Sequence, residues 1–318
     1  MMDGLFLLLG LAVLIKGADF LVEGASVVAS RFGISGLVIG LTVVSFGTSM
    51  PELLVSLTSG LKNNPDLAIA NVIGSNIANV LLVLGIAAIV RPLPIRNSTV
   101  VSEVPFTLTA ALLVGFLANA HLFSDDPKLS ISRLDGGILL FFFLLFMLYV
   151  YKSSTTKDSP VSSATADGTL TRSVAYIGLG ALGLYFGGQW VVDGAVGLAE
   201  HWGINDALIG LTVVAIGTSS PELVASAVAA YRNKTDIAVG NVVGSNIFNL
   251  LWVLGLTSSI VELPFEVVSN TDLLVVIGSS AMIILALVSS RGNSVNRSHG
   301  MAFVGAYVVY LAYVVQRG

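Results

Sequence analysis

Residues 39–85 read IGLTVVSFGTSMPELLVSLTSGLKNNPDLAIANVIGSNIANVLLVLG, and residues 209–255 read IGLTVVAIGTSSPELVASAVAAYRNKTDIAVGNVVGSNIFNLLWVLG. The two stretches align without a gap, with Ile39 opposite Ile209, and 27 of their 47 paired positions are identical. The identities include glycine, proline, glutamate, asparagine, serine and threonine, and not only the aliphatic residues that unrelated apolar helices share by chance. The repeat therefore indicates a gene duplication that built the chain from two related halves.

The composition of the chain places these repeats in a membrane. Of its 318 residues, 55% are hydrophobic and only 11% are charged, and the mean hydropathy is +0.90. A soluble domain of this length needs more charge to cover its surface. Cysteine is absent, which excludes disulfides, thiol catalysis and thiolate metal sites. Nothing in the sequence indicates a cofactor, a nucleic-acid partner or an obligate protein partner.

Ten stretches are apolar over the roughly 20 residues that a membrane-spanning helix needs. They lie at about 4–30, 35–61, 66–90, 100–119, 134–151, 173–199, 205–231, 236–260, 271–290 and 299–316. The first has no basic leader and is interrupted by polar residues, so we expect a spanning helix rather than a cleaved signal. The sequence thus predicts an all-α polytopic membrane protein.

A polar segment divides the ten stretches into two sets of five. Residues 152–172 are rich in Ser, Thr, Ala and Asp and read as a flexible linker between a first repeat, 1–151, and a second, 173–318. Outside the spans, ten Lys and Arg residues fall on the linker side of the membrane and four on the other. The positive-inside rule then places the linker in the cytoplasm and both termini outside. The short linker and the lack of targeting features in the sequence lead us to expect a plasma membrane of prokaryotic type.

The odd number of spans in each half has a topological consequence. The second copy must enter the membrane from the opposite side, so the two five-helix repeats are inverted. Inverted repeats place a substrate site near the bilayer midplane, formed by broken helices from both halves.

Two glutamates lie deep within predicted spans. Glu52 and Glu222 stand far from either end of their helices, where an ionisable group costs at least about 2.5–3.5 kcal/mol on insertion scales. Such residues usually line a functional cavity, and no Lys or Arg repeats with them as a structural partner. Each follows a proline, which breaks the helix and frees the carbonyl four residues earlier, here that of Gly47 or Gly217. A bound cation is one partner for such a carbonyl.

Other polar residues recur at helical spacing around the glutamates. The first half carries Ser45, Thr48, Ser49, Glu52 and Ser56 on one face, then Asn71, Ser75 and Asn79; the second carries Thr218, Ser219, Glu222 and Ser226, then Asn241, Ser245 and Asn249. Ser45 is matched by Ala215, so the two half-sites differ chemically. Hydrogen bonds within or between helices explain Ser56, Ser226, Asn71 and Asn241 equally well.

Every candidate ligand in these motifs is an oxygen donor. Carboxylates, hydroxyls and carbonyls suit Na⁺ and Ca²⁺ and disfavour zinc or copper. Two carboxylates balance one Ca²⁺ or two Na⁺. If three Na⁺ occupied the region, exchange would move one net charge and respond to voltage, by about 2.3 kcal/mol per charge per 100 mV. Three further acids, Asp19, Glu23 and Asp193, lie near predicted helix ends, so we do not place them in the site.

These motifs resemble those of the calcium/cation antiporter superfamily, and within it the prokaryotic sodium/calcium exchangers. GTSMPE followed by GSNIAN, and GTSSPE followed by GSNIFN, carry the resemblance, which covers essentially the whole chain. It implies four ion positions midway through the bilayer, and a first and sixth helix that slide across an eight-helix core. The implied ligands are carboxylates at Glu52 and Glu222, hydroxyl or carbonyl oxygens at Thr48, Ser49, Thr218 and Ser219, hydroxyls at Ser75 and Ser245, amides at Asn79 and Asn249, and backbone carbonyls at Ser45 and Ala215.

The resemblance implies a secondary antiporter that exchanges Na⁺ for Ca²⁺, rather than an enzyme. Some relatives carry Asp where this chain has Asn249, and two neutral asparagines argue mildly against potassium co-transport. The first alternative is an H⁺/Ca²⁺ antiporter that uses the same two glutamates. A cation channel is disfavoured because one chain already holds a complete two-fold pair. A hydrolase with Ser49 or Ser219 as nucleophile lacks a His or Lys base at depth.

Overall fold

The computed structural model describes residues 2–62, 64–95, 102–120, 129–155, 169–201, 215–265, 267–290 and 293–317. Up to residue 155 the helices are α1 (Met2–Phe32), α2 (Gly36–Ile39), η1 (Gly40–Val44), α3 (Ser45–Thr48), α4 (Met50–Leu61), α5 (Pro65–Ala78), η2 (Asn79–Leu84), α6 (Gly85–Val90), α8 (Glu103–Asn119) and α9 (Arg133–Thr155). From residue 170 they are α10 (Leu170–His201), α12 (Ala215–Thr218), α13 (Ser220–Tyr231), α14 (Thr235–Ile247), η5 (Phe248–Val253), α15 (Leu254–Ile260), α16 (Val267–Ser289) and α17 (Arg297–Arg317).

Most of these helices have the length and composition of membrane spans. Among the described residues seven do, and an eighth span forms if the bent pair 36–48 and 50–61 is counted as one. α8 is shorter, at 17 residues, and the predicted span 205–231 is described only from residue 215. The prediction of a helical polytopic membrane protein is confirmed. The number ten stays a prediction, and most of the 152–172 linker lies outside the described residues.

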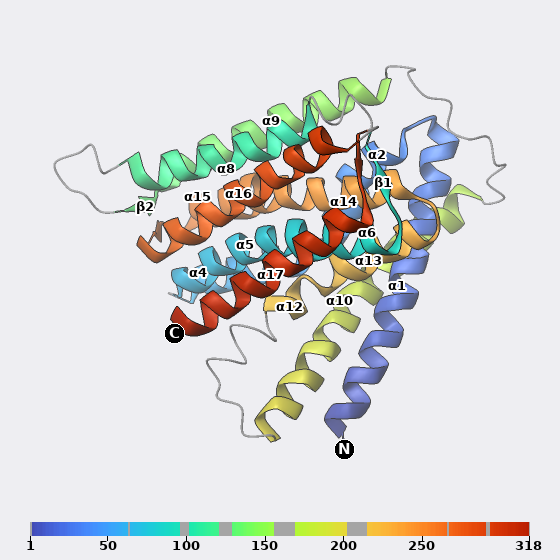
Figure 1. Ribbon diagram of the computed structural model, residues 1–318, viewed down its shortest axis with the longest axis horizontal. Helices are drawn as coiled ribbons and strands as arrows, with labels where there is room; N and C mark the ends of the chain where they lie inside the picture. The colour runs from blue at the N-terminus through green and yellow to red at the C-terminus, as the bar shows by residue number, and fades with distance from the viewer. Residues whose placement is uncertain are drawn as a thin grey trace.

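Two composite helices form the centre of the molecule. α5, η2 and α6 run from residue 65 to 90, and α14, η5 and α15 run from 235 to 260; 78% and 94% of their spanning windows are buried. Figure 1 shows α8, α9, α16 and α17 arranged around them, with α9 on an outer face. A helix that is apolar on every side belongs in such an interior, and here both copies of the repeated motif supply one.

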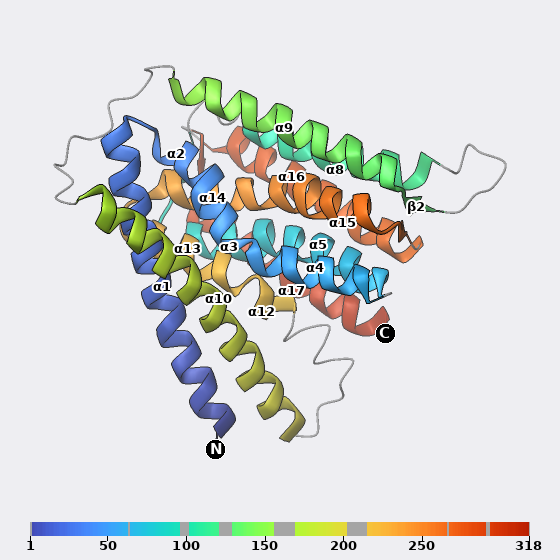
Figure 2. The ribbon, with the colours of Figure 1, turned by 180° about the vertical axis from the view of Figure 1, so that it is seen from behind.

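α1 and α10 pack against each other and project away from the remaining helices, as both views show (Figures 1 and 2). Glycines spaced seven residues apart let the two backbones approach closely. A Cβ atom at Gly17 would lie 2.8 Å from the backbone nitrogen of Leu184, and one at Gly187 would lie 2.8 Å from that of Leu14. Gly17 and Gly187 stand opposite each other when the alignment of the two repeats is extended, so the internal repeat includes these two helices.

Four two-residue strands, which the sequence did not predict, connect the two halves. β1 (Leu93–Pro94) pairs antiparallel with β4 (Ser294–Val295), and β2 (Ser130–Ile131) pairs antiparallel with β3 (Leu263–Pro264). β1 and β3 are equivalent in the alignment of the two repeats. Each of the two strand pairs therefore contains one strand from the first half and one from the second.

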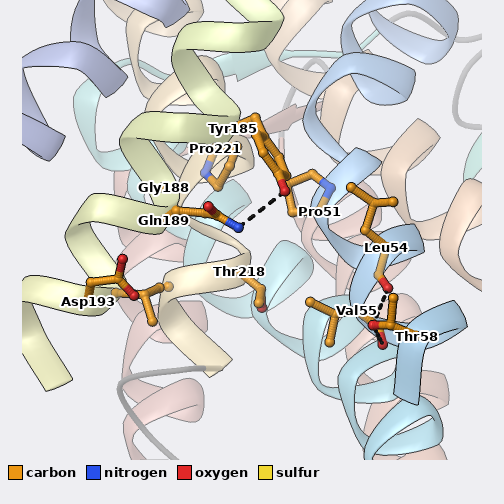
Figure 3. A pocket seen from close by; sticks show the side chains of 12 residues that line it. Pro51, Leu54, Val55, Thr58, Tyr185, Gly188, Gln189, Asp193, Thr218 and Pro221 are labelled. Carbon is orange, nitrogen blue, oxygen red and sulfur yellow. Dashed lines mark hydrogen bonds between the residues drawn. The ribbon is translucent and has the colours of Figure 1, made fainter. Parts of the chain in front are cut away.

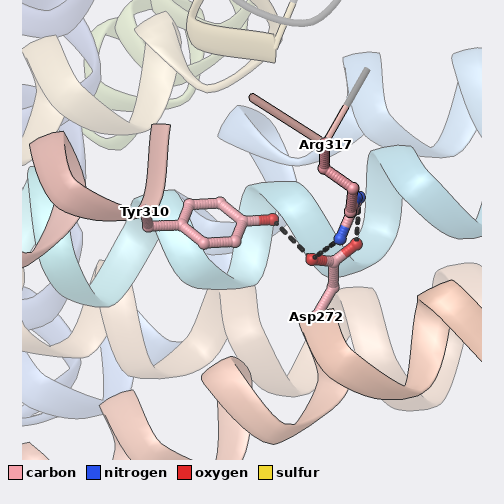
Figure 4. Close-up of polar contacts among 3 residues, drawn as sticks. All are labelled: Asp272, Tyr310 and Arg317. Carbon is pink, nitrogen blue, oxygen red and sulfur yellow. Dashed lines mark hydrogen bonds and ion pairs between the residues drawn. The ribbon is translucent and has the colours of Figure 1, made fainter. Parts of the chain in front are cut away.

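Polar contacts at the periphery join α16 to its neighbours. Arg317, the last residue of α17, donates two hydrogen bonds to the Asp272 carboxylate, at 2.9 and 3.0 Å, and the Tyr310 hydroxyl donates a third at 3.2 Å (Figure 4). Asn119 of α8 and Asn270 exchange side-chain amide hydrogen bonds of 2.7 and 2.8 Å. These contacts tie the C-terminal helix and α8 to α16.

Candidate cation site

The predicted helix breaks lie at repeat-equivalent serines. Ser49 has φ −85° and ψ 7°, and Ser219 has φ −85° and ψ 4°, so each leaves the helical region of ψ for one residue. The helix axis bends by 46° at the first break. Pro51 and Pro221 occupy the first turn of the helices that follow, where a missing N–H is tolerated. The sequence predicted both breaks correctly.

Glu52 and Glu222 stand in the first turn of α4 and α13 and are fully buried. Ser49 donates a 3.0 Å hydrogen bond to Glu222 Oε1, so a residue of the first half holds the carboxylate of the second. Ser75 donates to Glu52 Oε1 at 3.3 Å, and its repeat equivalent Ser245 donates to Glu222 Oε1 at 3.5 Å. A cation bound between two carboxylates relieves the repulsion between their negative charges.

Hydroxyl groups complete the connection between the halves. Ser219 donates to Ser75 Oγ at 3.3 Å. The hydroxyls of Thr48 and Ser245 lie 3.4 Å apart, and Thr48 also donates to Asn241 Oδ1 at 3.0 Å. All of these residues are buried. The structure thus brings together in one cluster residues that the sequence separates by 144 to 197 positions.

Four of the predicted site residues carry buried side-chain atoms that have no hydrogen-bond partner among the described residues. They are Glu52 Oε2, Glu222 Oε2 and both amide atoms of Asn79 and of Asn249. Each of these side chains is at most 1% exposed. A buried polar atom left unpaired costs about 1–3 kcal/mol, so repeat-equivalent pairs of such atoms are candidates for ligand contacts. The carboxylate and amide oxygens suit a hard cation, and the amide nitrogens would need an acceptor such as water.

π-helical turns mark the positions of the two asparagines. Asn79 is the first residue of η2, and Asn249 is the second residue of η5. A π-turn inserts one residue into an α-helix, shifts the register of the side chains that follow, and occurs often at functional sites. Neither turn could be predicted from the sequence, because no residue type or spacing marks the one residue that a π-turn inserts.

Asn71 and Asn241, whose role the sequence left open, make equivalent structural bonds. Asn71 donates to the backbone carbonyl of Glu52 at 3.2 Å and to Ser56 at 2.9 Å. Asn241 donates to the carbonyl of Glu222 at 3.5 Å and to Ser226 at 2.9 Å. Each pair therefore fixes the backbone that carries a glutamate, and we assign these residues to positioning.

The backbone carbonyls at the breaks are not equivalent in the two halves. The Ser220 hydroxyl donates to the Gly217 carbonyl at 2.7 Å, so this freed carbonyl has a partner within its own motif. Met50 stands at the position of Ser220 and supplies no such bond to Gly47. The Ser45 carbonyl accepts the backbone N–H of Ser49 at 2.9 Å, and its side chain donates to the Asn241 carbonyl at 3.0 Å. The structure describes no side-chain position for Ala215.

A cavity of about 460 Å³ opens beside one of the breaks. Pro51, Pro221 and Thr218 line it, and they precede or flank the two glutamates in the sequence (Figure 3). Thr218 is partly exposed there, whereas its repeat equivalent Thr48 is fully buried. Thr218 at the second-half break therefore borders open space, and Thr48 at the first-half break does not. Asp193, which the sequence assigned to a helix end, also lines this cavity.

A helical membrane protein whose two repeated halves share a buried, oxygen-lined acidic cluster belongs to the class of cation transporters. The sequence profile of the sodium/calcium exchanger protein family matches residues 3–152 and 172–316, and the chain belongs to this family. It is a family of membrane ion exchangers, and the relatives that match this chain include proteins named as a sodium/calcium exchanger and as a calcium/proton antiporter.

Individual relatives match over almost the full chain. The sodium/calcium exchanger MaX1 of Methanosarcina acetivorans is 32% identical in an alignment of 342 positions that covers 96% of this chain and 97% of that protein. The inner membrane protein YrbG of Escherichia coli is 35% identical over 316 residues, 96% and 94% of the two chains. A solved structure of the sodium-calcium exchanger NCX_Mj superposes with a TM-score of 0.82 at 32% identity, covering 98% of each chain.

Proposed function

We propose that the protein exchanges Na⁺ for Ca²⁺ by alternating access to a site formed by the two repeats. The observation that carries the proposal is the symmetric pair Glu52 and Glu222, fully buried, each with one carboxylate oxygen that has no partner among the described residues. Two negative charges without a Lys or Arg partner need cations, and one Ca²⁺ or two Na⁺ would neutralise them.

We assign the ligand set from the described contacts and from the sequence. The glutamates and the unpaired amides of Asn79 and Asn249 are the inner ligands. The hydroxyls and carbonyls around the breaks supply further oxygens; they belong to Ser45, Thr48, Ser49, Ser75, Thr218, Ser219 and Ser245, with the backbone carbonyl of Ala215. The transported ions are the only bound metal in the proposal, and it requires no cofactor or protein partner.

The topology that we propose has ten spans in two inverted five-helix repeats, 1–151 and 173–318, joined by a cytoplasmic linker. The crosswise strand pairs support it, because each joins an end of one half to an end of the other. With both termini outside, the 460 Å³ cavity would face the exterior, since Thr58 on its wall lies near the loop that carries Lys62. We place the protein in a prokaryotic plasma membrane, in keeping with the name of its inner-membrane relative.

The coupling ion is the part of the proposal that the site chemistry leaves most open. The same two carboxylates could exchange protons for Ca²⁺, and the sequences of the family motifs favour sodium. If three Na⁺ exchange for one Ca²⁺, transport carries current. Flux without current would rule out this stoichiometry and leave the exchange itself intact.

The test is ⁴⁵Ca²⁺ uptake into proteoliposomes at clamped voltage, driven either by an outward sodium gradient or by a pH gradient. We expect uptake to follow the sodium gradient and to disappear in Glu52→Gln. Uptake that follows the pH gradient alone would replace sodium with protons as the coupling ion. Uptake that persists in Glu52→Gln under either gradient would remove the proposed site.

A further inference from the structure

An ion pair connects α1 to the helix that carries Glu222. Arg232, the C-cap of α13, places guanidinium nitrogens 2.9 Å from Asp19 Oδ1 and 3.6 Å from Glu23 Oε2. The two carboxylates are four residues apart and therefore share one face of α1. At this end of the molecule the guanidinium group of Arg232, at the end of α13, binds α1, which is one of the two projecting helices.

The repeat places the same kinds of residues at the other end. The alignment of the two halves relates Lys62 to Arg232 and Asp193 to Glu23, and it relates Gln189 to Asp19. Lys62 is the C-cap of α4 with φ −88° and ψ 14°, close to the −79° and 11° of Arg232. Both partners of a second ion pair, on α4 and on α10, are thus present in the chain.

This second pair is not formed in the structure. Neither Lys62 nor Asp193 has an ion pair within the described part of the chain. Instead, Asp193 and Gln189 line the 460 Å³ cavity, and its opposite wall includes Thr58, one helical turn before Lys62 (Figure 3). The cavity therefore lies between α10 and α4, the helices that are equivalent to those joined by the ion pair of Arg232 and Asp19.

Side chains near Arg232 are also more deeply buried than the equivalent side chains near Lys62. Ala225 and Val22, at the end with the ion pair, are each 1% exposed. Their repeat equivalents Val55 and Val192 are partly exposed and line the cavity. α1 packs along α13, whereas contacts between α10 and α4 are sparse. One end is closed and paired, and the equivalent end is open and unpaired.

We propose that these are two ionic gates that close alternately, Arg232 with Asp19 and Glu23 at one end and Lys62 with Asp193 at the other. The inference rests on the proposed alternating-access function. Because α1 and α10 are packed together, a movement of the pair that brings Asp193 to Lys62 also withdraws α1 from Arg232. The second gate has Gln189 in place of a carboxylate, so it holds its closed state less firmly than the first.

The first test cross-links each gate. The chain has no cysteine, so two thiols introduced as Asp19→Cys with Arg232→Cys, or as Asp193→Cys with Lys62→Cys, are the only ones present. Each pair joins the two halves, and a protease site inserted within residues 156–168 reports the bond, because the cleaved halves then stay together. We expect a short bis-methanethiosulfonate reagent, which spans the length of the removed side chains, to link both pairs under exchange conditions, each link to stop ⁴⁵Ca²⁺ exchange, and reduction to restore it. Failure of the second pair to cross-link under any ionic condition, while the first does, would overturn the proposal.

The second test keeps the thiols away from the gates. Labelling of Val55→Cys and of its equivalent Ala225→Cys by a membrane-impermeant maleimide reports which end is open. We expect Arg232→Gln to speed labelling at residue 225 about two- to fivefold, the range of an exposed ion pair, and to slow it at residue 55. Lys62→Gln should shift both rates in the opposite direction.

Arg232→Gln and Lys62→Gln also distinguish an ionic gate from a cation that only stabilises the end of its own helix. A cation near a helix C-terminus interacts favourably with the helix dipole, and loss of that interaction alone would leave both labelling rates unchanged. Unchanged rates, or shifts in the same direction for both variants, contradict the gates. Labelling needs no particular coupling ion, so a protein that exchanged protons for Ca²⁺ would still give the expected rates, and the two proposals fail separately.

Discussion

The Ser49 hydroxyl lies 3.0 Å from Glu222 Oε1, so a serine at the helix break of the first half holds the carboxylate of the second. The reverse contact is different, because Ser219 donates to Ser75 at 3.3 Å, and Ser75 in turn donates to Glu52. The two glutamates are therefore held by related but unequal sets of hydroxyls. Glu222 therefore accepts a hydrogen bond directly from the other half, whereas Glu52 is connected to the other half through Ser75.

Neutralising either central glutamate should abolish calcium transport. Glu52→Gln or Glu222→Gln leaves a single buried negative charge, which cannot balance one Ca²⁺. Glu103→Gln is the matched control, because Glu103 is also a buried glutamate of a transmembrane helix and accepts a 2.9 Å hydrogen bond from Tyr149 away from the cluster. We expect ⁴⁵Ca²⁺ uptake to be lost in the first two variants and retained in the control. Equal loss in all three would indicate a general effect on folding.

The cross-half hydrogen bond should matter more for affinity than for folding. Ser49→Ala removes the donor to Glu222, and hydrogen bonds to charged groups contribute about 1.5–3 kcal/mol, or roughly 10- to 150-fold in affinity. Ser279→Ala removes an equally buried hydroxyl that bonds only its own helix, to Val276. Titration of ⁴⁵Ca²⁺ uptake should show a raised half-saturation concentration for the first variant and little change for the second. The reverse order would contradict the assignment of Ser49.

The repeated motifs made much of this arrangement predictable. The Pro-Glu dipeptides located both breaks, and the four-residue spacing of polar residues placed Ser75 and Ser245 beside the glutamates. The sequence could not predict which contacts cross between halves, because that depends on how the two repeats dock. It also could not predict the π-turns at Asn79 and Asn249, since no residue type or spacing in these stretches marks one inserted residue.

The sequence also could not show that Asp193 borders a cavity. It places this carboxylate toward one end of a long apolar helix, and composition alone does not show which face of that helix meets open space. In the structure α10 borders a cavity, and Asp193 lies on its wall. The packing of α10 against α1, through glycines on both helices, determines which face of α10 meets that cavity.

Adding a carboxylate at Asn249 should make transport sensitive to pH. Both amide atoms of Asn249 are buried and have no partner among the described residues, so Asn249→Asp adds a third negative charge to the proposed ligand set. An aspartate must lose its proton before it can bind a cation, so uptake by this variant should fall as the pH is lowered, more steeply than in the wild type. Asn119→Asp is the control, because Asn119 bonds to Asn270 outside the cluster. Sodium-driven ⁴⁵Ca²⁺ uptake is measured across a pH series for Asn249→Asp and Asn119→Asp. The same pH dependence in both variants would contradict the role of Asn249.

Close packing of α1 on α10 should be sensitive to a single added methyl group. In Gly187→Ala the new Cβ would lie 2.8 Å from the backbone nitrogen of Leu14, so the two helices must separate. Overpacking of this kind costs about 1–3 kcal/mol. Gly178→Ala, on the same helix with no atom within 4 Å of the added Cβ, controls for the change in helix propensity. We expect a lower Tm in detergent and slower exchange for the first variant only. If both variants matched the wild type in Tm and exchange rate, the helices would not be held together by these glycines.

The ion pair at the C-terminal helix should contribute to stability and leave transport unchanged. Arg317 and Tyr310 both donate to Asp272, so Asp272→Asn removes a carboxylate that accepts three hydrogen bonds at the edge of α16 (Figure 4). The side chains of Arg317 and Asp272 are 27% and 15% exposed, so the bidentate geometry should be worth more than the roughly 0–1 kcal/mol median for surface pairs. The expected result is a lowered Tm with an unchanged half-saturation concentration for Ca²⁺. Arg317→Gln should lower the Tm in the same way, and Asp272→Asn combined with Arg317→Gln should cost less than the sum of the two, because both substitutions remove one interaction. A weakened affinity for Ca²⁺ in either variant would show instead that the position of α16 is coupled to the cation site through the α5 helix on which it packs.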